Sequence, residues 1–81
     1  MEIEFSRHSR RRIALYNIDE KDVRHIINSV IMDKRLVSGK YEEVNYDLKS
    51  KYGYPLKIAF VIEDDGVTVL SVYPLKKEKA R

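Results

Sequence analysis

The stretch LKIAFVIEDDGVTVLSVY, residues 56–73, decides the fold. Two β-rich runs, Leu56 to Glu63 and Val67 to Tyr73, are joined by Asp64-Asp65-Gly66, a strong signal for a β-hairpin. A three-residue loop usually combines a type I turn with a glycine bulge. We therefore expect Gly66 to form the bulge and Glu63 to face Val67.

This register sorts the hairpin residues onto two faces, with Lys57 opposite Tyr73 and Ala59 opposite Ser71. The bulky apolar face should meet the helices and carries Ile58, Phe60, Ile62, Leu70 and Val72. The smaller, more polar face should be open to solvent and carries Lys57, Ala59, Val61, Ser71 and Tyr73.

The region before the hairpin predicts one strand and two helices. Glu2 to Phe5 alternates polar and apolar residues, the period of a short strand. Ser6 can cap a helix that ends near Asn17. Asp19 caps the second helix, with Asp22 supporting its first turn. Its apolar stripe consists of Val23, Ile26, Ile27, Val30 and Ile31.

Between helices and hairpin, the alternation of Val44, Tyr46 and Leu48 predicts one more strand, after a turn at residues 38–40. The order is β-α-α-β-β-β. We expect an α+β fold in which both N-terminal helices pack on one face of an antiparallel sheet. Residues 1–75 form the domain, and residues 76–81 form a basic C-terminal tail.

Composition limits the class of protein. The 81 residues contain no cysteine, which disfavours a disulfide-stapled secreted domain. The longest stretch without a charged residue, residues 66–75, is too short to span a bilayer, so we expect a cytoplasmic protein without membrane contact. The 36% of charged residues and the lack of glutamine suggest a thermophilic source, a hypothesis that the melting temperature would test.

Many catalytic motifs are missing. The three glycines form no phosphate-binding loop, and the two histidines have no metal-ligand spacing. We expect no cofactor. The remaining arginine, lysine, histidine and tyrosine side chains suit metal-independent RNA cleavage, because the RNA 2′-hydroxyl is the nucleophile and the protein supplies proton transfer and charge stabilisation.

The net charge of +3 comes from one basic cluster at residues 7–12. Arg7, Arg10 and Arg11 crowd the positive end of the first helix dipole, where a bound phosphate would be favoured. The alternative is that these arginines project into water or pair with Glu2 and Glu4.

Two further groups have an open interpretation. His8, Arg12 and Tyr16 share one helical face, either as a polar edge beside the open sheet face or, as we favour, as a border of the core. Tyr52 and Tyr54 flank a turn and are candidates for base stacking.

The start of the chain resembles a small bacterial and archaeal domain family of unknown function that begins with a His-Ala-x-x-Arg-Met-x-x-Arg-Gly-Ile-Ser-type pattern. Tyr16 and Asn17 replace its second arginine and its glycine. The later hairpin also resembles that family. The residues in step are His8, Ser9, Arg12, Ile13, Ile18, Asp19, Asp22 and Val23.

That family is similar to the RelE/ParE/BrnT toxin superfamily, which shares the β-α-α-β-β-β plan. The resemblance implies an endoribonuclease with basic residues on its sheet, a tyrosine or histidine near its C-terminus and an antitoxin protein as partner. Lys57 and Tyr73 match those roles by strand placement. ParE-like relatives act on gyrase instead, so fold analogy alone does not fix function.

The leading hypothesis is a toxin-like, metal-independent endoribonuclease. Tyr73 or His8 would transfer protons, and Lys57 and Arg12 would stabilise phosphate charge. The alternative is a non-catalytic module that binds nucleic acid or a protein such as an antitoxin. The residues expected to bind RNA are Arg7, Arg10, Arg11, Tyr52 and Tyr54.

Overall fold

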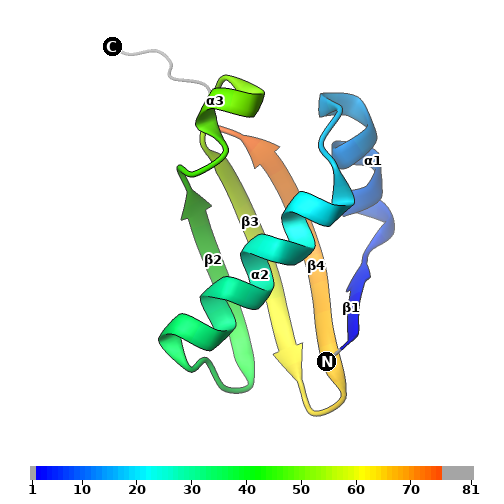
Figure 1. Ribbon diagram of the computed structural model, residues 1–81. Coiled ribbons are helices and arrows are strands. Elements are labelled where there is room, and N and C mark those ends of the chain that lie inside the picture. The colour runs from blue at the N-terminus through cyan, green and yellow to red at the C-terminus, as the bar shows by residue number, and fades with distance from the viewer. Residues whose placement is uncertain (1, 76–81) are drawn as a thin grey trace.

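The computed structural model describes residues 2–75, so the predicted basic tail at 76–81 lies outside the described residues. The described part contains four strands and three helices (Figure 1). In chain order they are β1 (Glu2–Phe5), α1 (Arg7–Tyr16), α2 (Glu20–Lys34), β2 (Gly39–Asn45), α3 (Lys49–Tyr52), β3 (Leu56–Glu63) and β4 (Gly66–Pro74). None of these helices is long and apolar enough to cross a membrane.

The four strands form one mixed sheet in the order β1-β4-β3-β2. β3 is antiparallel to both of its neighbours, whereas β1 runs parallel to β4. The α+β class is confirmed, but the prediction of a purely antiparallel sheet is wrong at this edge. The long connection from β1 to the rest of the sheet allows the parallel pairing, which a short hairpin could not.

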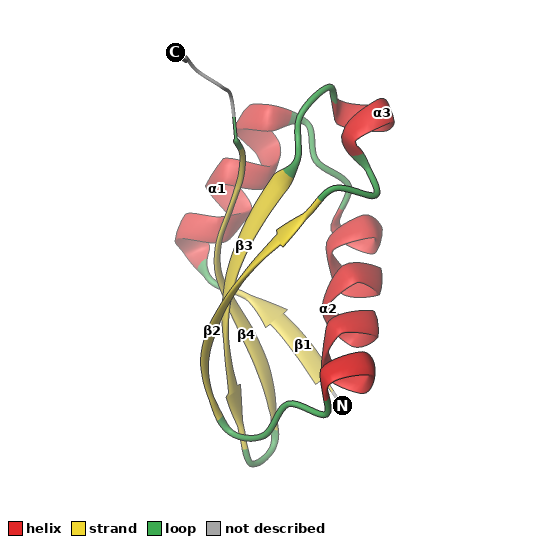
Figure 2. Cartoon of the chain, turned by 90° about the vertical axis from the view of Figure 1, so that its left-hand side faces the viewer, coloured by secondary structure: helices red, strands yellow, loops and turns green. Residues whose placement is uncertain are grey.

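The two long helices occupy different places. α2 lies across one face of the sheet, here called the inner face, while α1 runs beside β4 beyond the end of β1 (Figures 1 and 2). The prediction that both helices cover one face is therefore wrong for α1. Ser6 makes this turn because its N–H donates to the Val69 carbonyl and its hydroxyl to the Leu70 carbonyl.

Both predicted helix starts are confirmed. The Ser6 side chain accepts from the Ser9 N–H, and the Asp19 side chain accepts from the Lys21 N–H. Asn17 ends α1 in the left-handed conformation at φ 55°, as expected.

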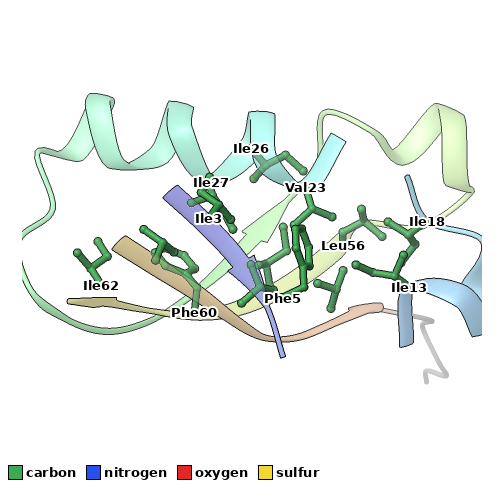
Figure 3. Packing of buried hydrophobic residues seen from close by; sticks show 14 residues of the cluster. Ile3, Phe5, Ile13, Ile18, Val23, Ile26, Ile27, Leu56, Phe60 and Ile62 are labelled. Carbon is green, nitrogen blue, oxygen red and sulfur yellow. The ribbon is translucent and has the colours of Figure 1, made fainter. Parts of the chain in front are cut away.

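One hydrophobic core lies between α2, the inner face and the second half of α1, where Ile13 and the following Ile18 are buried (Figure 3). Val23, Ile26 and Ile27 of the predicted stripe are buried in it. The residues of β1, β3 and β4 that complete the core are Ile3, Phe5, Leu56, Ile58, Phe60, Ile62, Val67, Val69 and Val72.

The hairpin differs from the prediction in the position of its extra residue. Glu63 pairs with Gly66, so the turn contains only Asp64 and Asp65. The register shifts instead between Phe60, which pairs with Val69, and Ala59, which pairs with Ser71. A bulge at Leu70 therefore directs Val69 rather than Leu70 into the core, which corrects the predicted inner face.

Gly66 is needed for close approach rather than for a turn. Its φ is not positive, but a Cβ at this position would lie 2.9 Å from the Glu2 carbonyl oxygen. A side chain at residue 66 would therefore force β1 to shift away from β4 at Glu2.

The strand predicted around Val44–Leu48 is displaced. β2 begins at Gly39 and ends at Asn45, and the chain then turns into α3, which the sequence did not predict. Tyr46 is exposed in the turn before α3, while Leu48 packs against the core. The short helix is closed by Gly53 at φ 85°.

Candidate functional site

The candidate site lies on the face of the sheet opposite α2, here called the outer face. Its side chains are half-buried or exposed, and no helix covers its β2 and β3 strands in residues 2–75 (Figure 2). The strand registers place on this face Lys40, Glu42, Val44, Lys57, Ala59, Val61, Thr68, Ser71 and Tyr73.

Lys57 and Tyr73 are direct cross-strand partners on the outer face, as predicted. Lys57 Nζ also lies 3.3 Å from Glu42 Oε1 of β2. The hydrogen bond and charge of Glu42, with a smaller contribution from Tyr73, raise the pKa of Lys57. These contacts favour the ammonium form of Lys57, which suits charge stabilisation.

His8 and Arg12 form a second pair, in which Arg12 Nε donates to His8 Nε2 at 3.4 Å. Arg10 of the same helix reaches towards α2 and binds Glu20. At about 100° per residue, His8 and Arg12 lie about 160° around the helix from Arg10. They therefore face away from α2, on the outer side of the sheet.

The helix that carries His8 and Arg12 lies alongside the part of β4 that contains Tyr73. Ser6, at the start of the helix, is bonded to Leu70, and Tyr16, at its end, shares a small hollow with Pro74. Tyr73 lies between these two points of β4. The lysine and the phenol are thus cross-strand partners, and the helix that carries the arginine and the imidazole runs beside the strand of the phenol.

The predicted RNA-binding arginines have different surroundings. Arg10 Nη1 lies 2.8 Å from Glu20 Oε2, and its guanidinium lies 5.7 Å from the centre of the Phe5 ring. RNA binding by Arg10 would require this ion pair to break, so we remove it from the proposed surface. Arg7 and Arg11 are exposed, and Ser6 caps the helix end that they flank.

Tyr52 links α3 to the start of α2 through its hydroxyl. Its hydroxyl accepts from the Asp19 N–H at 3.0 Å and donates to Asp22 Oδ2 at 2.5 Å. Asp22 was expected to support the first turn of α2. Its carboxylate accepts a hydrogen bond from Tyr52 of α3 instead. Tyr54 remains a candidate for base stacking because the residue is 39% exposed and lines the same hollow as Pro74.

The Asp22 contact predicts a pH dependence of stability. Hydrogen bonds from Lys51, at 2.7 Å, and then from Tyr52 lower the pKa of Asp22. Because the folded-state pKa lies below the unfolded value, the contribution is complete above the unfolded pKa and is lost as pH falls through the folded one. We expect Asp22→Asn to cost about 1–2 kcal/mol at pH 7, with the difference from wild type shrinking below about pH 4.

Urea unfolding between pH 3 and pH 7 measures this difference. Asp33→Asn is the control, since it removes an exposed carboxylate from the same helix without touching Lys51 or Tyr52. A pH-independent difference between Asp22→Asn and wild type would contradict the assignment.

Glu42 is the site residue that the sequence analysis missed. Its position opposite Ala59 depends on the register of β2 against β3, and the strand was predicted to begin only at Val44. Correct placement of the strand start at Gly39 would have revealed it, since alternation puts Lys40, Glu42 and Val44 on one face.

No group of three or more histidine, cysteine or acidic side chains arranged to hold a metal ion occurs in residues 2–75. The chain matches no family model, no curated protein and no solved structure.

Proposed function

We propose that this domain is a metal-independent endoribonuclease that binds single-stranded RNA across its outer face. The observation that carries the proposal is the cross-strand pairing of Lys57 with Tyr73 on the outer face, where both residues are half-buried. The helix that carries His8 and Arg12, α1, runs beside β4, the strand of Tyr73. As an enzyme acting on cellular RNA, the protein would work in the cytoplasm.

The chemistry requires only groups of this kind. The 2′-hydroxyl attacks the adjacent phosphorus, the bond to the 5′-oxygen breaks, and the products carry a 2′,3′-cyclic phosphate and a 5′-hydroxyl. Tyr73 can donate a proton to the leaving 5′-oxygen, and Lys57 can stabilise the charge that develops on the phosphoryl oxygens. Arg12 can hold a phosphate oxygen, and His8 can exchange a proton.

A second candidate function is a protein- or nucleic-acid-binding module without catalysis, such as a partner of an antitoxin. It is favoured by the edge of the sheet, where β2 pairs only with β3 within residues 2–75. An edge strand offers unpaired backbone groups to a strand from another protein. Binding there would leave the outer face accessible.

Incubation of the protein with labelled single-stranded RNA in excess EDTA tests the proposal. We expect cleavage with cyclic-phosphate ends, and no cleavage of a substrate with 2′-deoxyribose at the cut site. Tyr73→Phe should lower the rate on the order of 100-fold because it removes the donated proton. Equal rates for both proteins would exclude Tyr73 from the mechanism, and no cleavage by wild type would favour the binding module.

A further inference from the structure

We propose that Glu42 is the general base of this reaction and takes the proton from the RNA 2′-hydroxyl. The inference rests on the proposed ribonuclease function and completes it with a residue that the sequence analysis did not consider. Glu42 lies on the outer face, its side chain is 64% exposed, and its Oε1 is 3.3 Å from Lys57 Nζ.

The three groups stand on three neighbouring strands. Tyr73 of β4 is directly opposite Lys57 of β3, whereas Glu42 of β2 is opposite Ala59 and reaches Lys57 diagonally through its ion pair. A phosphate bound at Lys57 would therefore have a carboxylate on one side and a phenol on the other. In-line attack requires this arrangement, because the attacking and leaving oxygens lie on opposite sides of the phosphorus.

The ion pair gives Glu42 a defined resting position. When a phosphate binds, Lys57 can turn its ammonium group to the phosphoryl oxygens and release Glu42 Oε1. The carboxylate then accepts the 2′-hydroxyl proton as the 2′-oxygen–phosphorus bond forms. Tyr73 gives its proton to the 5′-oxygen as the old bond breaks, and solvent returns a proton to Tyr73 and removes one from Glu42.

His8 is the other candidate base. It belongs to α1, which runs along β4, so it would approach a phosphate at Lys57 from the side of the strand that carries Tyr73. An acid and a base on the same side of the phosphorus would not serve in-line attack. The position of Glu42 across Lys57 therefore favours the carboxylate.

The neighbouring Glu43 provides a matched control. It is the next residue of β2 but points to the inner face, where its Oε1 accepts from Lys34 Nζ at 3.2 Å. Glu42→Gln and Glu43→Gln remove the same charge from adjacent positions on opposite faces of one strand.

The experiment measures kcat on cleavable RNA and Kd on the same RNA with 2′-deoxyribose at the cut site. For Glu42→Gln we expect kcat to fall about 10²–10⁴-fold, with Kd unchanged or lower because a competitor for Lys57 is removed. Glu43→Gln should keep both values near wild type. Thermal melting of each variant checks that the fold is retained.

The pH profile separates the two possible bases. The acidic limb of kcat should be lost in Glu42→Gln and retained in His8→Asn, since the limb reports protonation of the base. A wild-type kcat in Glu42→Gln, or an acidic limb that disappears in His8→Asn, would overturn the inference while leaving the ribonuclease function intact. A wild-type protein that cleaves no RNA would overturn both.

Discussion

Replacement of Phe60 by alanine is expected to destabilise the domain by about 3–5 kcal/mol. The ring is fully buried in the core beneath α2 (Figure 3). Its centre lies 5.7 Å from the ring centre of Tyr41 on β2. Truncation removes this contact and leaves a cavity that the surrounding strands cannot close. A domain of this length has a total stability of about 4–12 kcal/mol, so the variant should be partly or fully unfolded at 37 °C.

The next residue supplies the control for this prediction. Val61 points to the outer face and is only half-buried, so Val61→Ala should cost less than about 1 kcal/mol. Urea unfolding followed by circular dichroism measures both variants. Similar losses at positions 60 and 61 would mean that the two faces of β3 are wrongly assigned.

Local signals in the sequence predicted the helices well. The caps at Ser6 and Asp19, the left-handed Asn17 and the buried stripe of α2 all depend on residues within a few positions of one another. Side chains and backbone groups that lie close together in the sequence determine these features.

The bulge and the parallel strand depend on contacts between distant residues. Ser6 bonds to Leu70 across 64 positions, and Glu2 approaches Gly66 closely enough to exclude a side chain there. Turn statistics favour a bulge at Gly66, but they contain no information about β1. The pairing of β1 with β4 therefore could not be inferred from the hairpin alone.

The candidate site was predicted only in part for the same reason. Lys57 was expected to face Tyr73, and it does, because the predicted turn and the observed bulge each insert one residue into β4 before Ser71. Glu42 requires the register of a strand whose limits were predicted wrongly. The ion pair that holds Arg10 joins two helices and has no local signal.

Replacement of Lys57 by methionine is expected to lower kcat for RNA cleavage by about 10²–10³-fold while weakening RNA binding by less than about tenfold. Methionine keeps the length and the apolar stem of lysine but removes the charge. The pair with Glu42 raises the pKa of Lys57, so the ammonium form is present at neutral pH and available to the developing phosphoryl charge. The loss should therefore fall mainly on the transition state.

Lys40→Met is the matched variant, because Lys40 lies on the same face of the sheet, exposed and at the opposite end of β2 from Val44. It should weaken RNA binding to a similar degree and leave kcat close to wild type. Rates for both variants at saturating RNA, with Kd measured on the 2′-deoxy substrate, distinguish the two effects. If the two variants lose binding equally and neither loses kcat, Lys57 contributes only general positive charge, and the outer face binds RNA without a specific role for the lysine opposite Tyr73.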